Sequence, residues 1–437
     1  MSDLTVNASG DPIIDNRVRG FPSGHPPMKL EAIGERGWSP YDGVMSLPLI
    51  SLDETAFAGN IRAMIDYVKG QGVEIAPHAK TPMSVDLARR LISLGAWGTT
   101  VADIRQASVL LKAGLTRLIT ANETGGIAAA RRLAAAVAGH KEIELHVFVD
   151  SLDAVDALLK AWAERDDLPA IGLLIEFGVG RAGARTLETG MVLLNAILSS
   201  ESPTFRLTGI AAYEGSAATQ DPVQTSNRIK DLMALTASFL PIVRERLNDG
   251  RRLIVTAGGS VFFDMVVDGL GIAVASDHNC ILILRSGAIF FHDHGVYERG
   301  LKSLDARRGF VVAGSLRSAS KEFVPALRLW AEVLSQPEPK LAIVGMGMRD
   351  VASDQDLPRP LFLYRDGKRI SDLAGTHVQR LNDQHAFVSM SEQTELKVGD
   401  VIEFGVSHPC TCLDRHAILY GLDQGHRVVK AYLTSFG

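Results

Sequence analysis

Cysteine is scarce in this chain, which contains only Cys280, Cys410 and Cys412. An odd number of cysteines in a long chain does not indicate a disulfide framework, so a small secreted fold held by disulfides is excluded. Apolar runs of the roughly 18–20 residues that cross a bilayer are also missing. The N-terminal stretch MSDLTVNASGDPIIDN is polar and mildly acidic, whereas a signal peptide is basic and then apolar. The sequence therefore predicts a cytoplasmic protein with no membrane partner.

Blocks of basic residues are absent as well. Lysine and arginine number 45 against 50 aspartate and glutamate residues, a net charge of −5 at pH 7, and this balance argues against nucleic acid as a partner. The chain has 437 residues. Because domains usually span about 100–200 residues, we expect two domains, one of them large.

Strand-like and helix-like sequence patterns alternate regularly through the middle of the chain. Short runs rich in Val, Ile and Thr are followed by stretches with helical periodicity. Eight such repeats predict an α/β fold, a (β/α)8 TIM-like barrel, with an open doubly wound sheet as the alternative. The strands expected in the barrel are 73–79, 97–103, 117–123, 144–150, 170–177, 207–215, 252–259 and 280–287.

These patterns divide the chain into three parts. Residues 1–45 carry Gly and Pro and few periodic apolar stretches, and we expect an N-terminal arm that packs on the β-domain. Residues 46–290 are expected to form the barrel, and residues 291–437, which read as short strands and turns, a mostly antiparallel β-domain. Active sites of such barrels lie at the C-terminal ends of the strands, so the residues that end each β-run are the first candidates.

The first candidate is Lys80, which follows the first expected strand in the run Pro77-His78-Ala79-Lys80-Thr81. Its side chain would emerge at the barrel mouth from dry surroundings, and a lysine in such a place is a candidate Schiff-base former. On position alone, a surface lysine at the end of a strand is the alternative.

Two glycine-rich turns are the next candidates. Thr256, Gly258, Gly259 and Ser260 end the seventh strand, where barrels often bind a phosphate with backbone N–H groups, although a tight βα turn explains the glycines equally well. The run 178–183 lacks the spacing of a dinucleotide fingerprint, and no Walker lysine follows it. Its use would be to point Arg181 into the mouth, with an ordinary solvated arginine as the alternative.

Potential metal ligands gather near the C-terminus. His408 and Cys410 follow a β-run, and residues two apart on an extended stretch share a face, which suits a borderline-soft ion such as zinc. No second ligand pair is present, so an ion held there would keep open positions. Incidental thiols at a strand end are the alternative. His292, Asp293 and His294 also resemble a metal triplet, for which a structural hydrogen-bond network is the favoured interpretation.

Five motifs taken together resemble one family. The chain is similar, from about residue 48 to its C-terminus, to the D-serine dehydratase and D-threonine aldolase group of pyridoxal-phosphate (PLP) enzymes, which share the alanine racemase type of fold. The motifs are P-H-A-K-T (77–81), G-V-G-R-A-G (178–183), A-A-Y-E-G (211–215), T-A-G-G-S (256–260) and H-P-C (408–410).

The resemblance implies a role for each matching residue. Lys80 would hold PLP as a Schiff base and, together with His78 and Arg181, would be catalytic. Arg181 would lie near the phenolic oxygen of PLP, and Tyr213 near its pyridine nitrogen. His408 and Cys410 would hold a divalent metal, zinc first, with manganese or cobalt as alternatives. The residues implied to bind the cofactor are Lys80, Arg181, Tyr213, Thr256, Gly258, Gly259 and Ser260.

The chain departs from the family pattern in its first motif. Many members have an arginine before P-H and a histidine and a lysine after K-T, where this chain has Ala76, Pro82 and Met83. That pattern is closer to the bacterial amino-acid (D-serine) deaminase subgroup. The metal motif also discriminates, because dehydratases of the family resemble His-x-Cys, as in His408 and Cys410, whereas the D-threonine aldolases tend to show His-x-Asp.

The resemblance therefore implies a PLP- and metal-dependent ammonia-lyase that converts D-serine, or a related small D-β-hydroxyamino acid, to an α-keto acid and ammonia. The alternative is a retro-aldol lyase of the D-threonine aldolase type, which gives glycine and an aldehyde. A racemase is disfavoured because it has no use for a metal, and a non-catalytic PLP carrier because such proteins lack a second domain. Members of this fold resemble head-to-tail dimers, so a homodimer is expected.

Overall fold

Eight parallel strands form the sheet that the alternating sequence predicts. They are β4 (Glu74–Ile75), β5 (Thr99–Val101), β6 (Arg117–Glu123), β7 (Glu144–Val149), β8 (Ile171–Phe177), β9 (Phe205–Ala212), β10 (Leu253–Ala257) and β11 (Cys280–Leu284). Neighbours in the chain are neighbours in the sheet, and β11 pairs with β4. Backbone hydrogen bonds from Trp97 to Ile75 and from Ala79 to Thr100, both 2.8 Å, join β4 to β5. The computed structural model, which describes residues 12–436, therefore confirms the barrel over the open sheet.

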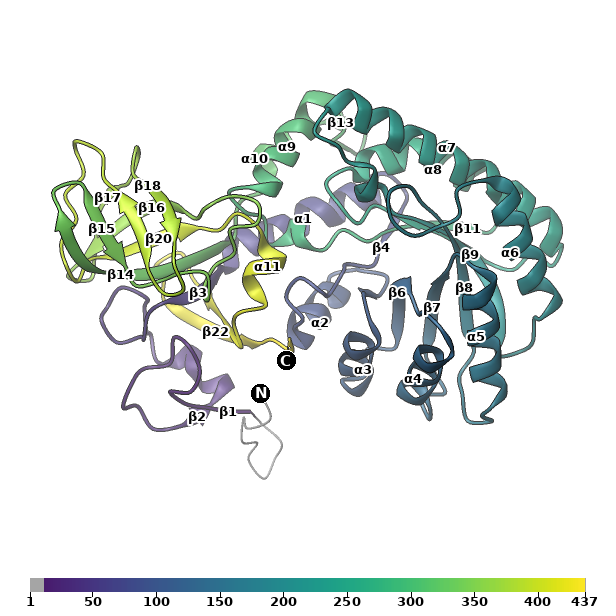
Figure 1. Ribbon diagram of the computed structural model, residues 1–437, viewed down its shortest axis with the longest axis horizontal. Coiled ribbons are helices and arrows are strands. Elements are labelled where there is room, and N and C mark those ends of the chain that lie inside the picture. The colour runs from purple at the N-terminus through teal and green to yellow at the C-terminus, as the bar shows by residue number, and fades with distance from the viewer. Residues whose placement is uncertain (1–11, 437) are drawn as a thin grey trace.

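Helices follow the strands and cover the outside of the barrel (Figure 1). Several begin at a side chain that accepts hydrogen bonds from first-turn N–H groups, among them Asp53, Asp103 and Asp221. No helix among the described residues has both the length and the apolar character needed to span a membrane. The helices of this lobe are α1 (Glu54–Gly70), α2 (Val85–Ser93), α3 (Ile104–Lys112), α4 (Ile127–Val137), α5 (Leu152–Ala163), α6 (Leu187–Ser199), α7 (Pro222–Leu247), α8 (Phe263–Ser276) and α9 (Val296–Arg307).

Successive side chains along each strand point to opposite sides of the sheet, so the barrel has two separate hydrophobic cores. Outward-facing residues pack under the helices, and inward-facing residues fill the barrel interior. Along β8, Gly172, Leu174 and Glu176 face inward one after another, so the apolar Leu174 separates two polar ends of the barrel. The buried residues of this inner layer are Ala76, Trp97, Ile119, Phe148, Leu174, Ala211, Ile254 and Ile283.

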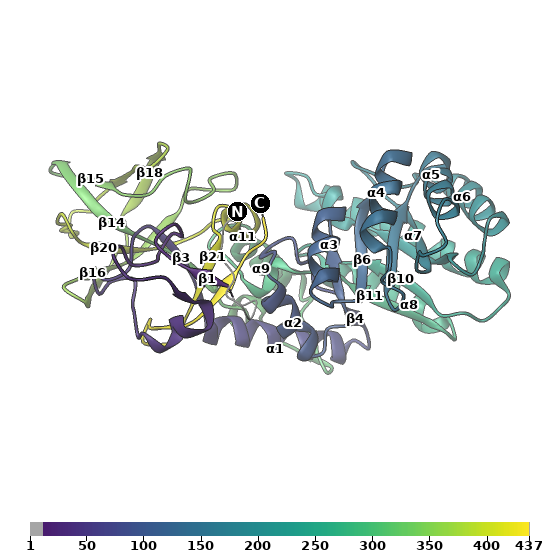
Figure 2. The same cartoon turned by 90° about the horizontal axis from the view of Figure 1, so that it is seen from below.

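A mostly antiparallel sheet forms the second lobe (Figure 2). One of its strands, β3 (Leu49–Asp53), comes from the range 46–290 expected for the barrel. It pairs with β14 (Leu327–Glu338) and β21 (Ile418–Leu422) of this sheet. Residues after 290 were expected to form only strands and turns. This prediction was wrong for residues 296–307, which form the helix α9 of the barrel lobe. The other strands of this lobe are β14 (Leu327–Glu338), β15 (Leu341–Val344), β16 (Arg359–Arg365), β17 (Lys368–Asp372), β18 (His377–Leu381), β19 (Ala386–Ser389), β20 (Val401–Gly405), β21 (Ile418–Leu422) and β22 (Val428–Leu433).

The described part of the N-terminal arm, residues 12–45, lies against this second sheet. It contains β1 (Ile13–Ile14) and β2 (Met28–Lys29) and a turn of 3-10 helix. Its Phe21 and Trp38 belong to one buried cluster with Trp330 and Tyr420, and its Tyr41 stacks on Tyr364 at 4.4 Å between ring centroids.

We expect Trp330→Ala to lower the free energy of unfolding of the C-terminal lobe by about 3–5 kcal/mol, because it opens a cavity in this cluster. Trp330 is fully buried, and its indole Nε1 donates to Ser51 Oγ at 2.8 Å. Urea unfolding followed by tyrosine and tryptophan fluorescence would measure the change. Val398→Ala is the control, since Val398 is 65% exposed and its truncation should cost less than about 0.5 kcal/mol. An equal loss in both variants would contradict the assignment of Trp330 to the core.

Candidate active site

Lys80 lies at the mouth of the barrel, in the loop that follows β4, and its side chain is exposed. The dry surroundings expected for it are therefore not provided by this chain alone. The next residue contacts the other lobe, because Thr81 Oγ1 lies 3.2 Å from Cys410 Sγ. The fold thus brings the residue after the predicted Schiff-base lysine into contact with a predicted metal ligand that is more than 300 positions away in the chain.

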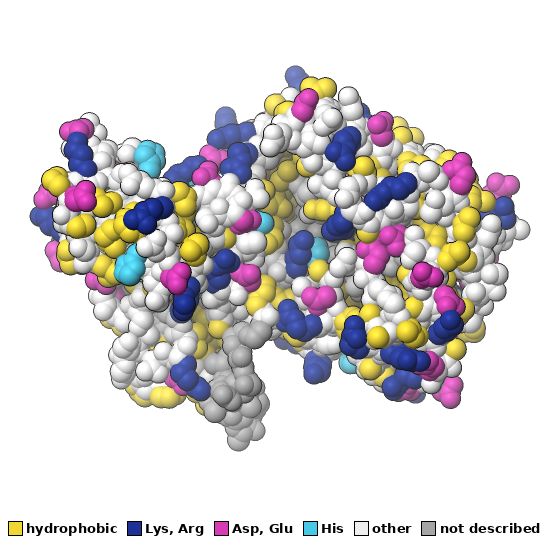
Figure 3. Space-filling model, in the orientation of Figure 1, with side chains coloured by type: hydrophobic (Ala, Val, Ile, Leu, Met, Phe, Trp, Pro, Cys, Tyr) yellow, Lys and Arg dark blue, Asp and Glu magenta, His cyan; other side chains and the backbone are white. Residues whose placement is uncertain are grey.

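The mouth opens into a hollow between the two lobes, and basic side chains gather around it (Figure 3). His78 lies on its barrel side. Burial, followed by the charges of Lys80 and Arg285, lowers the pKa of His78 well below its ordinary value. The imidazole is therefore neutral at physiological pH, and can take part in hydrogen bonds without adding positive charge.

Arg285 forms the base of the mouth and is buried in the barrel. Its guanidinium donates to Thr256 Oγ1 at 2.9 Å and to Ala212 O at 2.8 Å, and stacks over Phe148. Burial lowers the pKa of Arg285, while the charges of Glu214 and Glu176 oppose that effect. Thr256 is fully buried and donates in turn to Ile283 O. It therefore holds Arg285, and does not face the open mouth as expected of a cofactor ligand.

The Gly-Gly-Ser turn after β10 is hydrogen-bonded to the carboxylate of Glu214. The carboxylate accepts from Gly258 N at 2.8 Å, Ser260 N at 3.0 Å and Ser260 Oγ at 2.6 Å. Glu214 is fully buried, so it binds the side of the turn that faces the protein interior. Of the three residues expected to bind a phosphate, Gly258 and Ser260 thus donate to Glu214, and Gly259 keeps a free backbone N–H within the described structure.

Tyr213 and Arg181 line the mouth beside this turn. The Arg181 guanidinium lies 4.8 Å from the centre of the Tyr213 ring, a cation–π distance. A side chain at Gly259 would place its Cβ 3.1 Å from the same ring, so the glycine permits the close approach. Burial and the neighbouring Glu214 raise the pKa of Tyr213, which keeps its phenol protonated.

Two glutamates face each other on the opposite side of the mouth. Glu176 is 1% exposed, and burial followed by the hydrogen bond and charge of Glu123 raises its pKa to about 9. Arg181 lies 3.9 Å from its Oε1. Two hydroxyl oxygens, Thr120 Oγ1 and Thr124 Oγ1, are also buried and have no hydrogen-bond partner within the described structure. The glutamate pair therefore holds a proton at neutral pH.

We expect this proton to make stability depend on pH, because a carboxyl group with a pKa of about 9 in the folded state and 4.5 outside it binds more protons when folded. The contribution is complete below the unfolded value and is lost as pH rises towards the folded one. Chemical unfolding at about pH 6 and about pH 9 should show wild-type protein losing more stability than Glu176→Gln, whose amide cannot ionise. Glu142→Gln, at an exposed site, should follow wild type. Parallel curves for wild type and Glu176→Gln would contradict the shift.

His408 and Cys410 lie at the start of α11 (Pro409–Leu413), so the extended stretch expected there was wrong. Burial lowers the pKa of the His408 ring, but the hydrogen bonds and charges of Cys410 and Asp354 outweigh this effect and raise the pKa to about 9. Asp354 lies 2.7 Å from His408 Nδ1.

Cys412 is fully buried in the core, where burial raises its pKa to about 12. Residues 12–436 contain no cluster of three or more His, Cys, Asp or Glu side chains that could bind a metal.

The His292-Asp293-His294 run forms the hydrogen-bond network favoured for it. Asp293 accepts from Gly295 N at 2.6 Å and Tyr297 N at 3.0 Å, at the start of α9. His294 N donates to Val406 O at 2.8 Å. The run therefore fixes the backbone that leads into His408.

Sequence reasoning missed four residues of the site. Glu176 had a signal, because it is the one charged residue in the apolar run AIGLLIEF. Glu214 and Arg285 lie in the expected strands 207–215 and 280–287, near their C-terminal ends, although their partners depend on the fold. Asp354 lies in a loop with no local pattern, so nothing in the sequence pairs it with His408.

Comparisons with known proteins agree with this architecture. A family model described as "Alanine racemase, N-terminal domain" matches residues 52–247, and one described as "Putative serine dehydratase domain" matches residues 326–422. The first covers most of the barrel lobe and the second most of the C-terminal sheet.

Individual relatives are distant but extend over most of the chain. A 3-hydroxy-D-aspartate aldolase of Paracoccus denitrificans is 25% identical over 386 residues, 86% of this chain and 89% of the relative. A D-threo-3-hydroxyaspartate dehydratase of a Delftia species is 26% identical over 258 residues, 53% of this chain and 65% of the relative. The crystal structure of D-threonine aldolase from Filomicrobium marinum has a TM-score of 0.69 at 22% identity, with 89% of this chain and 95% of that one covered.

Proposed function

Since this chain belongs to the D-serine dehydratase and D-threonine aldolase family of PLP enzymes, with the alanine racemase type of fold, we propose that it is a metal-dependent ammonia-lyase. Its substrate would be D-serine or a related small D-β-hydroxyamino acid, and its products an α-keto acid and ammonia. Relatives that act on hydroxy-D-aspartate or D-threonine support the substrate class.

The residues around the mouth fit PLP. Backbone N–H groups of Gly259 and Val261 have no partner among the described residues, and α8 begins just after them without a side-chain cap. Free N–H groups at the start of a helix favour a phosphate. Lys80 is exposed and free to bond the aldehyde. When bound, PLP supplies an electron sink for the charge left by removal of an α-proton.

Each remaining residue then has a defined task. Lys80 Nζ holds the cofactor between turnovers and, once a substrate amine has released it, takes the α-proton. His78 stays neutral, so the positive charge at the mouth belongs to Lys80, Arg181 and Arg285. Because Glu176 keeps a proton, it adds no negative charge at the mouth. The site is therefore suited to the carboxylate of an amino acid.

The donor set near the lysine fits a metal ion with open coordination positions. Cys410 Sγ and the His408 ring are a nitrogen and sulfur pair of the kind that zinc prefers. Asp354 holds His408 Nδ1 at 2.7 Å, which leaves Nε2 for the ion. The ion would supply a Lewis acid at the β-oxygen of the substrate, where hydroxide is otherwise a poor leaving group.

The contact between Thr81 and Cys410 is the observation that carries this proposal, because it puts the lysine run and the thiol at one site. The test is to incubate the enzyme with D-serine, D-threonine and 3-hydroxy-D-aspartate, and to assay ammonia, α-keto acid and glycine together. We expect ammonia and α-keto acid in equal amounts and no glycine. Glycine with an aldehyde as the main products would overturn the dehydratase assignment.

The retro-aldol reaction is the second candidate. It is supported by the aldolases among the relatives, one of which aligns with 86% of this chain. The same site would then deprotonate the β-hydroxyl instead of helping it to leave. The products of the two reactions differ, so the same assay separates them directly.

We also propose that the working enzyme is a homodimer. The support is that Lys80 is exposed in the single chain, whereas carbanion chemistry on a cofactor requires a site that excludes water. Light scattering at working concentration should give twice the mass of 47.1 kDa, and a monomer would refute the proposal.

A further inference from the structure

A second pocket, mostly apolar with a few polar groups, lies at the other end of the barrel, where the strands begin. Its volume is about 290 Å³. Phe148, Leu174 and Ile283 belong to the apolar layer that separates it from the mouth. Its lining comes from the first residues of β7 to β11 and the turns before them, and comprises Ile143, Glu144, Leu145, His146, Ala170, Ile171, Gly172, Arg206, Thr208, Arg252, Ile254 and Ile281.

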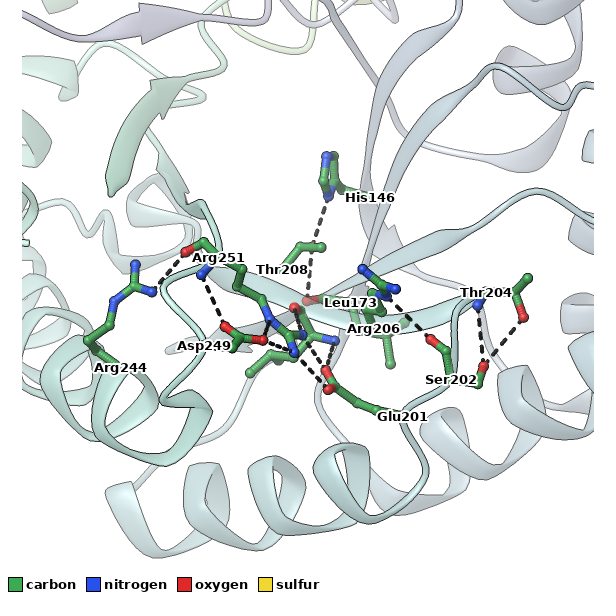
Figure 4. Close-up of polar contacts among 11 residues, drawn as sticks. His146, Leu173, Glu201, Ser202, Thr204, Arg206, Thr208, Arg244, Asp249 and Arg251 are labelled. Carbon is green, nitrogen blue, oxygen red and sulfur yellow. Dashed lines mark hydrogen bonds and ion pairs between the residues drawn. The ribbon is translucent and has the colours of Figure 1, made fainter. Parts of the chain in front are cut away.

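The absence of a side chain at Gly172 leaves room at the base of this pocket. A Cβ at that position would lie 2.5 Å from both His146 Nδ1 and Thr208 Oγ1. Without it, the imidazole and the hydroxyl meet at 2.9 Å across the strands, as Figure 4 shows. His146 is only 5% exposed. A pair of hydrogen-bonding groups is therefore fixed at the base of the pocket, where apolar side chains usually fill a barrel.

Two arginines at the rim of this pocket lack a carboxylate partner. Arg206 Nε reaches Ser202 O at 3.4 Å and has no other polar contact among the described residues, and Arg252 has none. Neighbouring arginines at the same end of the barrel are neutralised. Arg251 pairs with Glu201 at 2.6 Å, as Figure 4 shows. Arg244 pairs with Asp277 at 2.8 Å.

The one carboxylate in the pocket does not compensate these charges. Glu144 already pairs with Arg117 at 2.7 Å and with His146 at 3.3 Å. The hydrogen bond from His146, together with the charge of Arg117, holds the pKa of Glu144 below its ordinary value. Arg206 and Arg252 therefore leave a surplus of positive charge beside an apolar wall.

We propose that this pocket binds a small organic carboxylate that carries a hydroxyl or carbonyl oxygen next to its carboxylate and has an apolar body. Arg206 and Arg252 bind the carboxylate, since a guanidinium matches its planar geometry. The second oxygen lies against Thr208 Oγ1, a hydroxyl that also bonds His146 Nδ1 and Leu173 O. Ile143, Ile171, Ile254 and Ile281 contact the apolar body. The site is independent of the reaction at the mouth.

Calorimetric titration of the holoenzyme with four probes tests the chemistry. Salicylate has the carboxylate, the adjacent hydroxyl and an apolar ring; benzoate lacks the hydroxyl, benzamide the charge and inorganic phosphate the apolar body. We expect salicylate to bind most tightly, benzoate more weakly, and the other two at least about tenfold more weakly than salicylate. Absence of salicylate binding, or equal binding of all four probes, would overturn the proposal.

Four variants locate the binding. Arg206→Gln with Arg252→Gln should weaken salicylate about tenfold or more, and Thr208→Val should remove the preference for salicylate over benzoate. Arg132→Gln, at an exposed position of α4, is the matched control and should leave the affinity unchanged. Lys80→Ala should also bind salicylate as wild type does, and loss of binding in that variant would move the site to the mouth and refute the proposal. If the double variant does not fold, the probe series with Thr208→Val still decides the outcome.

Discussion

Lys80→Ala is expected to lower turnover by a factor of at least about 10⁴, because one side chain both anchors the cofactor and moves the substrate proton. The fold supports this expectation: Lys80 is at the mouth, exposed, and beside Thr81, which touches the C-terminal lobe. The measurement is steady-state formation of α-keto acid from D-serine. Borohydride reduction followed by peptide mapping should place the cofactor on Lys80 in the wild type.

Lys112→Ala is the matched control for this experiment. Lys112 is an exposed lysine at the end of α3 in the same lobe, and its removal should leave turnover within about twofold of wild type. A small primary amine added to Lys80→Ala should restore part of the activity, because it can supply the missing base. Label on any lysine other than Lys80 would refute the assignment on which the proposed reaction depends.

The barrel could be predicted because its signal is local and repeated. Each strand is an apolar run followed by a helix, and the expected run 117–123 coincides with β6. By contrast, β3 is also a short apolar run, LISLD, and nothing in its composition tells which of two sheets it joins. The pairing of β3 with β14 depends on residues more than 270 positions away, so only the folded chain decides it.

The candidate site shows the same division between local and distant information. Lys80 and the turn at Gly258 were predictable because strand ends in a barrel converge on its mouth. The partner of that turn was not, since Glu214 reaches it from the neighbouring strand end. The helix at His408 had a local signal, because proline is favoured at the first helical position and Pro409 occupies it.

Cys410→Ala is expected to lower dehydration of D-serine by about 10²-fold or more while the enzyme keeps its bound cofactor, because the change removes a proposed metal ligand and leaves the Lys80 run intact. Chelation of the wild type should give the same loss, and added Zn²⁺ should reverse it in the wild type but not in the variant. Asp354→Asn should be milder, about 10–100-fold, because it disturbs only the orientation of His408.

Cys280→Ala separates the loss of a ligand from the loss of a thiol. Cys280 begins β11 and is only partly buried, so its replacement should leave both activity and metal content unchanged. Cofactor absorbance, metal analysis and turnover need to be measured on the same samples, since a folding defect would lower all three together. Full activity in protein shown to be free of metal would refute a role of the ion in the reaction. His408 and Cys410 would then have a structural role. The contact between the Cys410 thiol and Thr81, the neighbour of Lys80, would serve to join the two lobes.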